Sequence, residues 1–362
     1  MSITVEDVKA ALSKVTDPNT GKDYCTSKEV RNLKVEGADV SFDIELGYPA
    51  KSQVEAIRAS VTGAVAALPG VGKVSANVYS KIISHTVQRG LKLMPNVKNI
   101  IAVASGKGGV GKSTTAVNLA LALAAEGASV GVLDADIYGP SQPMMLGING
   151  RPESKDGKTM EPLENHGVQV SSIGFMIDPD EPMVWRGPMV TQALQQLLEQ
   201  TNWRDLDYLV VDMPPGTGDI QLTLSQKVPV TGAVIVTTPQ DIALLDARKG
   251  LKMFEKVGIP ILGVVENMST HICSNCGHEE HIFGHGGGAK MCADFGAEYL
   301  GSLPLTMAIR EQTDSGKPTV AAEPDGPVAV IYKEIARKIA VKVAEKAKDM
   351  TSKFPSIVVK ND

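Results

Sequence analysis

The stretch from Ile100 to Ala125 constrains the fold of this chain more than any other part of the sequence. An apolar run comes first, the glycine-rich segment GKGGVGKST follows it, and a helical pattern of apolar residues comes last. The segment matches the pattern G-x-x-x-x-G-K-[ST] at Gly106, Gly111, Lys112 and Ser113. A strand, such a loop and a helix in this order predict a phosphate-binding loop in an α/β fold.

The chemistry of this loop is anion binding. Glycines allow backbone conformations closed to other residues, so successive N–H groups can point at phosphate oxygens in front of a helix N-terminus. Lys112 would reach the β- and γ-phosphates, and the hydroxyl of Ser113 would bind Mg²⁺. We expect the nucleotide to contact the whole loop: Gly106, Lys107, Gly108, Gly109, Val110, Gly111, Lys112, Ser113 and Thr114. Without its flanking strand and helix, the segment would be only a glycine-rich turn.

Carboxylates follow two further buried strands. Asp134 and Asp136 end the strand that begins at Val130, and Asp212 ends the strand that begins at Leu209. Ligands of open α/β sheets gather at the carboxyl ends of the strands, so we expect these acids to face the phosphates. The loop after Asp212 is rich in proline and glycine, and this acid is expected to hold the Mg²⁺ shell. Taken singly, the acids could be charged strand-end loops or a helix cap.

Composition excludes several classes of protein. The chain has 362 residues, enough for two or three domains, and its formal net charge of −5 and 4% aromatic content disfavour nucleic-acid binding. No apolar run approaches the length of a membrane span, and the N-terminus lacks a signal-peptide or transit-peptide pattern. We therefore expect a cytoplasmic protein that binds neither nucleic acid nor membrane. Four cysteines are too few and too unevenly spaced for a disulfide framework.

The periodicity predicts two folded parts. Residues 1–84 show helix, strand, strand, helix and strand patterns, which indicate a small α+β domain, and residues 85–98 are expected to be a linker. Residues 99–350 alternate strands with helices, which predicts a mainly parallel, doubly wound sheet. Residues 351–362 are expected to be a mobile tail.

Cys273 and Cys276 form a Cys-x-x-Cys motif, which fits zinc, a redox dithiol or an iron–sulfur cluster. A closed zinc site needs four ligands, which His281 and His285 could complete in a strained ribbon. A cluster typically takes four thiolates, so two chains sharing one cluster across a two-fold axis would supply them. We expect Cys25 to be an incidental thiol without a role in metal binding. Cys292 is expected to be a packed thiol within a helix.

The loop GKGGVGKST resembles the deviant Walker A loop of the MinD, ParA and nitrogenase iron protein superfamily. The resemblance implies an ATP-sandwich dimer in which Lys107 acts on the nucleotide of the partner subunit. It also implies that Asp136 orients the attacking water and that Asp134 supports Mg²⁺ or its waters. Asn267 would bind the adenine edge; without the resemblance it would be an ordinary turn residue.

From Asn99 to Lys348 the chain is similar to the Mrp/ApbC family of P-loop ATPases, through GKGGVGKST, LDADIYGPS, VVDMPPGTGD, ENMS, CSNCGH and IFGHGGG. This resemblance implies a homodimer with weak ATPase activity that holds a [4Fe–4S] cluster on Cys273 and Cys276 and passes it to apoproteins or receives it from assembly scaffolds. The N-terminal part resembles the PaaD-type iron–sulfur assembly domain through Asp17-Pro18 and Leu68-Pro69-Gly70-Val71. Two rival hypotheses are a MinD/ParA-like switch and a zinc-stabilised P-loop ATPase.

Overall fold

The computed structural model describes residues 3–85, 94–177, 187–273 and 275–351 of the chain. The chain divides into two compact units, Met1–Ile83 and Ser84–Asp362. Each unit has its own sheet and its own hydrophobic core, and each is described separately below.

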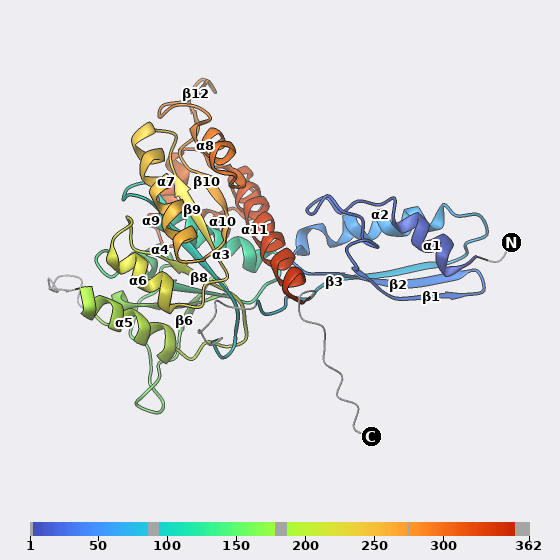
Figure 1. Cartoon of the computed structure of the whole chain (residues 1–362), viewed down its shortest axis with the longest axis horizontal. Coiled ribbons are helices and arrows are strands. Elements are labelled where there is room, and N and C mark those ends of the chain that lie inside the picture. The colour runs from blue at the N-terminus through green and yellow to red at the C-terminus, as the bar shows by residue number, and fades with distance from the viewer. Residues whose placement is uncertain (1–2, 86–93, 178–186, 274, 352–362) are drawn as a thin grey trace. The chain divides into compact units, whose positions relative to one another are not determined.

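The smaller unit is a three-stranded sheet with two helices, as the sequence pattern predicts (Figure 1). Strand β2 lies in the middle, antiparallel to β1 and parallel to β3. Alternate residues of β2 are buried, and they form a core with the apolar stripe of α2 because strand side chains alternate between faces. Its elements in chain order are α1 (Val5–Leu12), β1 (Val30–Glu36), β2 (Asp39–Leu46), η1 (Lys51–Gln53), α2 (Val54–Ala66) and β3 (Val74–Ser80).

The larger unit is built on an eight-stranded sheet with the order β13-β10-β9-β4-β8-β5-β7-β6. All neighbouring strands are parallel except the edge strand β6, which pairs antiparallel with β7. The prediction of a mainly parallel sheet is therefore confirmed. The strands are β4 (Val97–Ala104), β5 (Val130–Asp134), β6 (Leu163–Asn165), β7 (Val168–Ser172), β8 (Leu206–Asp212), β9 (Gly232–Thr237), β10 (Ile261–Glu266) and β13 (Tyr299–Ser302).

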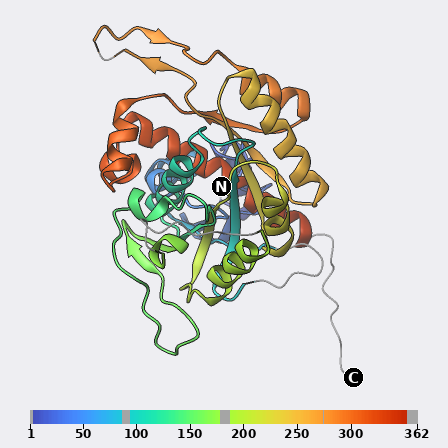
Figure 2. The ribbon, with the colours of Figure 1, turned by 90° about the vertical axis from the view of Figure 1, so that its left-hand side faces the viewer.

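Helices cover both faces of this sheet (Figures 1 and 2). Helix α3 packs against α11 on one face, while α5, α6, α7 and α8 succeed one another on the other. Ile100, Ala102 and Ala104 of β4 belong to the core on the face covered by α5 to α8. Side chains of a strand alternate between faces, so Ile101 and Val103 point to the face covered by α3 and α11. The helices are α3 (Lys112–Ala125), α4 (Gln142–Met145), α5 (Gly187–Gln200), α6 (Asp219–Lys227), α7 (Asp241–Lys256), α8 (Gly287–Phe295), α9 (Met307–Asp314), α10 (Thr319–Ala322) and α11 (Pro327–Thr351), with the short turn η2 (Ile173–Phe175).

The expected linker and tail fall mostly outside the described residues. Residues 86–93 of the linker are not described, and β4 begins at Val97, so the last two residues assigned to the linker belong to the sheet. Helix α11 extends to Thr351, and residues 352–362 lie outside the described ranges. None of the described helices combines the length and the apolar character needed to cross a membrane.

Candidate functional site: a nucleotide pocket and a cysteine hairpin

The glycine-rich loop lies where strand β4 ends and helix α3 begins. Strand β4 is flanked by β9 and β8, and the sheet continues in opposite directions from it, which makes this edge a topological switch point where α/β proteins bind ligands. Gly111 precedes the helix with a φ of +79°, and a Cβ there would overlap the side-chain amide of Asn267. Both the backbone conformation and the close approach therefore require glycine at this position.

A pocket of about 270 Å³ opens at this loop. It is smaller than a nucleotide site that has closed around its ligand, and it faces outward from the carboxyl edge of the sheet. Most of the loop residues predicted to bind the nucleotide line it, together with residues from three later segments. The lining residues are Ser105, Lys107, Gly108, Gly109, Gly111, Lys112, Ser113, Thr114, Asp136, Gly139, Ser141, Met145 and Pro215.

Lys112 is buried at the bottom of this pocket, with 6% of its side chain exposed. Its ammonium group pairs with the carboxylate of Asp212, which is fully buried at the end of β8, and donates to Ser113 Oγ at 3.2 Å. Gln142 Nε2 donates to the other oxygen of Asp212 at 2.9 Å and to the backbone oxygen of Ser113 at 3.2 Å. The lysine ammonium thus lies against the oxygens that sequence reasoning assigned to Mg²⁺.

Asp134 organises the loop that follows β5. It stands opposite Asp212 in the register of β5 and β8, and its buried carboxylate accepts hydrogen bonds from four groups of its own chain. These donors are the backbone N–H groups of Asp136 at 3.2 Å, Ser141 at 3.0 Å and Gln142 at 3.1 Å, and the hydroxyl of Ser172 at 3.0 Å. Burial, and then the charge of Asp212, raises the pKa of Asp134 to about 7.

Asp136 and Lys107 both line the pocket, but they differ in their partners. Asp136 Oδ2 lies 3.8 Å from Lys112 Nζ, and burial raises the pKa of Asp136 while the charge of Lys112 opposes that shift. Lys107 is half-buried, and Ser105 Oγ donates to its backbone oxygen at 2.9 Å. Within the described ranges no carboxylate pairs with the ammonium group of Lys107, so this charge is available to a ligand or a partner chain.

Oxygen donors for a cation converge on the same place. Ser113 Oγ and the Asp212 carboxylate are present, and Ser141 Oγ and Gln142 Oε1 are buried without a hydrogen-bond partner among the described residues. Mg²⁺ prefers such hard oxygen ligands and water. The donor set therefore fits Mg²⁺, although the carboxylate of Asp134 is already occupied by its four N–H and O–H donors.

Asn267 is buried beneath the loop. Its Nδ2 donates to Val110 O at 2.9 Å, and its backbone N–H donates to Thr237 O at 2.8 Å. The side chain expected to read the adenine edge is therefore bound to the glycine-rich loop itself in this structure, and it does not line the pocket.

Residues 266–269 join this loop to the cysteine motif. Glu266 accepts a hydrogen bond from the backbone N–H of Gly288 at the start of α8. Met268 has a φ of +57°, a left-handed conformation that few non-glycine residues adopt, and it turns the chain sharply. The backbone oxygen of Ser269 is 3.1 Å from His281 Nδ1, just after the cysteine segment. This four-residue segment thus contacts the nucleotide loop at Val110 and the chain that follows the thiols at His281 and Gly288.

The two motif cysteines lie on a small hairpin that projects from the body of the larger unit (Figures 1 and 2). Strands β11 (His271–Ile272) and β12 (Glu279–Glu280) pair antiparallel, and the turn between them carries both thiols. Cys273 is half-buried and Cys276 is exposed. Hydrogen bonds from the backbone of Cys276, the backbone of Asn275 and the Cys276 thiol lower the pKa of Cys273, which favours the thiolate that binds metals.

The described residues form no closed metal site in one chain. Among them, no three His, Cys, Asp or Glu side chains lie where they could hold one metal ion, so the four-ligand zinc site with His281 and His285 is not assembled. The rings of these two histidines instead contact each other in a tilted arrangement, with 4.4 Å between centroids and 57° between ring planes. Cys292 is buried in α8, where burial raises its pKa to about 11, and Cys25 Sγ contacts the backbone oxygen of Lys9 at 3.5 Å.

Sequence reasoning missed several residues of this arrangement. Gln142 is fully buried and contacts Asp212, yet it follows a Gly-Pro turn that indicates only an exposed loop. Glu266 and His281 fall inside or beside quoted motifs, but no pattern indicated that they bond to Gly288 and Ser269.

Comparison with known proteins identifies both units. Residues 96–340 match the family described as "ParA: NUBPL iron-transfer P-loop NTPase", and residues 5–78 match the family described as "FeS_assembly_P: Iron-sulfur cluster assembly protein". The first match covers more than half of the chain and contains the pocket and the cysteine hairpin.

Curated relatives and a solved structure agree with these matches. An iron-sulfur cluster carrier protein from Pseudomonas fragi is 64% identical over 275 residues, which are 75% of this chain and 96% of that protein. One from Haemophilus influenzae is 47% identical over 337 residues, 93% of this chain and 91% of its own length. A nucleotide-binding protein from Archaeoglobus fulgidus, solved in complex with ADP, is 35% identical with a TM-score of 0.56, covering 64% of this chain and 90% of that one.

Proposed function

Because the chain belongs to the NUBPL iron-transfer P-loop NTPase family, we propose that it hydrolyses ATP weakly and carries a [4Fe–4S] cluster between two copies of itself. The cluster is cargo, which the homodimer receives from assembly scaffolds and passes to apoproteins. The observation that carries the proposal is the incomplete thiol pair on an exposed hairpin, because His281, the residue directly after this hairpin, contacts the same four-residue segment that binds the nucleotide loop.

Cluster binding would use Cys273 and Cys276 from each copy. A [4Fe–4S] cluster typically takes four thiolates, and a two-fold axis through the cluster would supply two from each chain. Support comes from the lowered pKa of Cys273, the exposure of Cys276, and the absence of further ligands around them in the described part of the chain. Thiolates at the surface also suit a cluster that must be released to another protein.

Nucleotide binding would use the backbone N–H groups of residues 106–114 and the ammonium of Lys112. ATP and Mg²⁺ would draw this ammonium towards the phosphates and leave Ser113 and Asp212 to the metal. Asp134 would act through the loop that it holds, since its oxygens already accept four hydrogen bonds. A bound Mg²⁺ would neutralise charge on the β- and γ-phosphates.

Hydrolysis would depend on two residues that line the pocket. Asp136, which lines the pocket, would orient the attacking water, and Lys107, which lacks a carboxylate partner within the described ranges, would reach the nucleotide of the other copy. Phosphoryl transfer needs mainly positioning and charge stabilisation, so turnover would be slow until both copies close.

The nucleotide state would reach the cluster through residues 266–269. Asn267 holds the backbone of the glycine-rich loop, while Ser269 contacts His281, directly after the cysteine hairpin, and Glu266 accepts a hydrogen bond from Gly288 at the start of α8. A shift of the loop upon ATP binding would therefore displace the hairpin and change the exposure of the cluster.

Anaerobic reconstitution with iron and sulfide tests the proposal. We expect visible absorption typical of a [4Fe–4S] cluster, about equal amounts of iron and sulfide, and activation of an apo-enzyme that requires such a cluster. Zinc bound without sulfide would support the zinc-stabilised ATPase instead. A reconstituted protein that keeps its cluster in the presence of the apo-enzyme would contradict carriage.

A further inference from the structure

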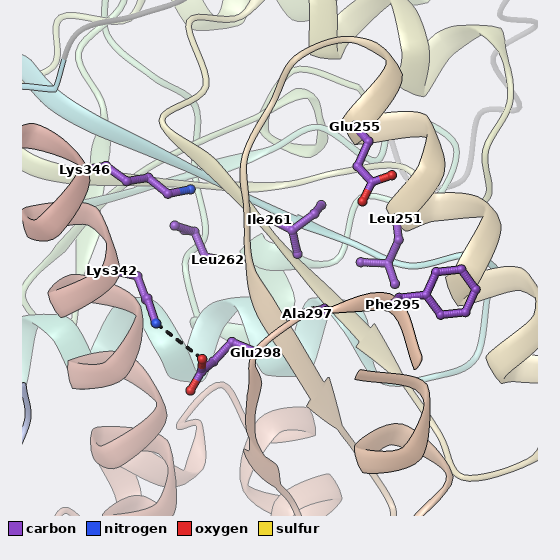
Figure 3. A pocket seen from close by; sticks show the side chains of 10 residues that line it. Leu251, Glu255, Ile261, Leu262, Phe295, Ala297, Glu298, Lys342 and Lys346 are labelled. Atoms are coloured by element: carbon purple, nitrogen blue, oxygen red, sulfur yellow. Dashed lines mark ion pairs between the residues drawn. The ribbon is translucent and has the colours of Figure 1, made fainter. Parts of the chain in front are cut away.

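Figure 3 shows a second cavity, of about 260 Å³. It lies at the opposite end of the strands from the nucleotide pocket, since it is lined by the first residues of β10, whereas that pocket opens where β4 ends. It opens beside the first residues of β10 and the residues just before β13, between α7 and the loop after α8 on one side and α11 on the other. Its floor is apolar, and its walls carry two acids and two lysines. The lining residues are Leu251, Glu255, Ile261, Leu262, Phe295, Gly296, Ala297, Glu298, Lys342 and Lys346.

The lysines belong to a row on α11. Lys338, Lys342 and Lys346 are four residues apart, so they share one face of the helix. Lys338 Nζ donates to Leu300 O at 2.8 Å, and Lys342 Nζ pairs with the Glu298 carboxylate at 3.3 Å. Lys346 is half-buried and extends towards Leu262, and across the described ranges it has neither a carboxylate nor a carbonyl partner (Figure 3).

Lys342 is the charged neighbour that acts most on Lys346, and Glu255 lies across the cavity on α7 (Figure 3). Burial, and then the charge of Lys342, lowers the pKa of Lys346, and the charge of Lys346 helps to lower the pKa of buried His85. The carboxylate of Glu298 already forms an ion pair with Lys342. Among the residues that the structure describes, the Lys346 ammonium has no partner of opposite charge, and an anion bound in the cavity would supply one through a charge-assisted hydrogen bond.

We propose that this cavity binds a small monocarboxylate with an apolar body. Its carboxylate pairs with Lys346, and its body covers Ile261, Leu262 and Phe295. The cavity is smaller than the usual 300–1,000 Å³ or so of drug-sized sites, which favours a short ligand. Glu255 and Glu298 on the walls disfavour a dianion such as phosphate. This site is independent of the proposed cluster carriage.

Calorimetric titration of the full-length protein with octanoate tests the proposal. We expect the unmodified protein to bind octanoate, and Lys346→Met, which keeps the apolar stem but removes the charge, to bind it about tenfold more weakly or worse. Lys256→Met, at an exposed lysine of α7 that does not line the cavity, is the matched control and should bind like the unmodified protein.

Octanol and inorganic phosphate keep the test decisive even if Lys346→Met folds poorly. With the unmodified protein, octanol lacks the charge and phosphate lacks the apolar body, so both should bind at least about tenfold more weakly than octanoate. No binding of octanoate at millimolar concentration would overturn the proposal. Binding that is equal for octanoate and octanol, or equal for the unmodified protein and Lys346→Met, would overturn it as well.

Discussion

The nucleotide pocket and the cysteine hairpin belong to the same unit, yet they are built in opposite ways. At the pocket, Lys112, Asp134 and Asp212 are buried, and their charged groups bond to one another or to the chain. At the hairpin, a turn between two strands of two residues each carries one half-buried and one exposed thiol. The pocket holds its polar groups in place before any ligand arrives, whereas the hairpin presents half of a ligand set.

This difference separates what one copy can do from what two copies must do. A preorganised pocket can bind a nucleotide in a single chain, because its donors and charges are already placed. A pair of thiolates cannot complete the four-thiolate coordination typical of a cluster. The comparison therefore predicts that nucleotide binding survives in a monomer while cluster binding does not.

Replacing Cys273 should have the largest effect. Cys273→Ala removes half of the thiolates that each chain offers, so we expect complete loss of cluster absorption after anaerobic reconstitution. The dissociation constant for ATP should stay within about twofold, because a surface substitution distant from the pocket changes the free energy little. Cys25→Ala, at a thiol of the smaller unit, is the control and should keep both functions. Loss of ATP binding together with the cluster would show that the two sites are not separable.

Replacing Lys112 should have the reverse effect. Lys112→Ala leaves the buried carboxylate of Asp212 without its cation, so it should destabilise the protein by about 3–5 kcal/mol and abolish ATP binding. Thermal unfolding and nucleotide titration measure these two losses. Cluster reconstitution at low temperature should still succeed.

Lys107→Ala is the matched lysine substitution in the same loop. Lys107 has no carboxylate partner within the described ranges. The substitution should therefore change the free energy of unfolding by less than about 0.5 kcal/mol, while ATP hydrolysis falls. Equal destabilisation by both lysine substitutions would contradict the buried pair as the reason for the Lys112 effect.

Breaking the connection between the two regions should have an intermediate effect. His281→Ala removes the contact with Ser269 O, so a reconstituted protein should keep its cluster but lose the dependence of iron release on ATP. The rate of iron capture by a chelator, with and without ATP, measures this coupling. His278→Ala, on the same hairpin, should leave it unchanged. If ATP still alters the rate in His281→Ala, the coupling does not depend on this contact.

The pH dependence of stability tests the burial of Asp134 beside Asp212. The pKa of Asp134 is raised from its ordinary value near 3.8 to about 7, so the folded protein binds this proton more tightly than the unfolded chain. Protonated Asp134 therefore stabilises the folded state fully below about pH 3.8, and this stabilisation is lost as the pH rises through about 7. Urea unfolding without nucleotide or Mg²⁺, from pH 5 to pH 8, should show this decline. The difference between the unmodified protein and Asp134→Asn isolates it, and a pH-independent difference would contradict it.

The sequence predicts the parts of this molecule that are encoded locally. The loop 106–114, the buried strands and the acids at their ends follow from spacing, because each motif is contiguous and parallel strands share one carboxyl edge. The arrangement of Asp134 opposite Asp212 follows from the same rule.

Contacts between distant segments could not be predicted in this way. The hydroxyl of Ser172 closes on Asp134 across 38 positions of sequence, and Asn267 reaches Val110 O across 157. Hydrophobic periodicity shows which apolar residues are buried, but it does not show which polar side chains packing will bury beside them. Gln142, between Asp212 and Ser113, is the clearest example.

The mass of the reconstituted protein tests the central claim most directly. Native mass spectrometry under anaerobic conditions should find one cluster of four iron and four sulfide atoms in a species of two chains. Every single chain should lack the cluster. A single chain that carries the complete cluster would contradict the account.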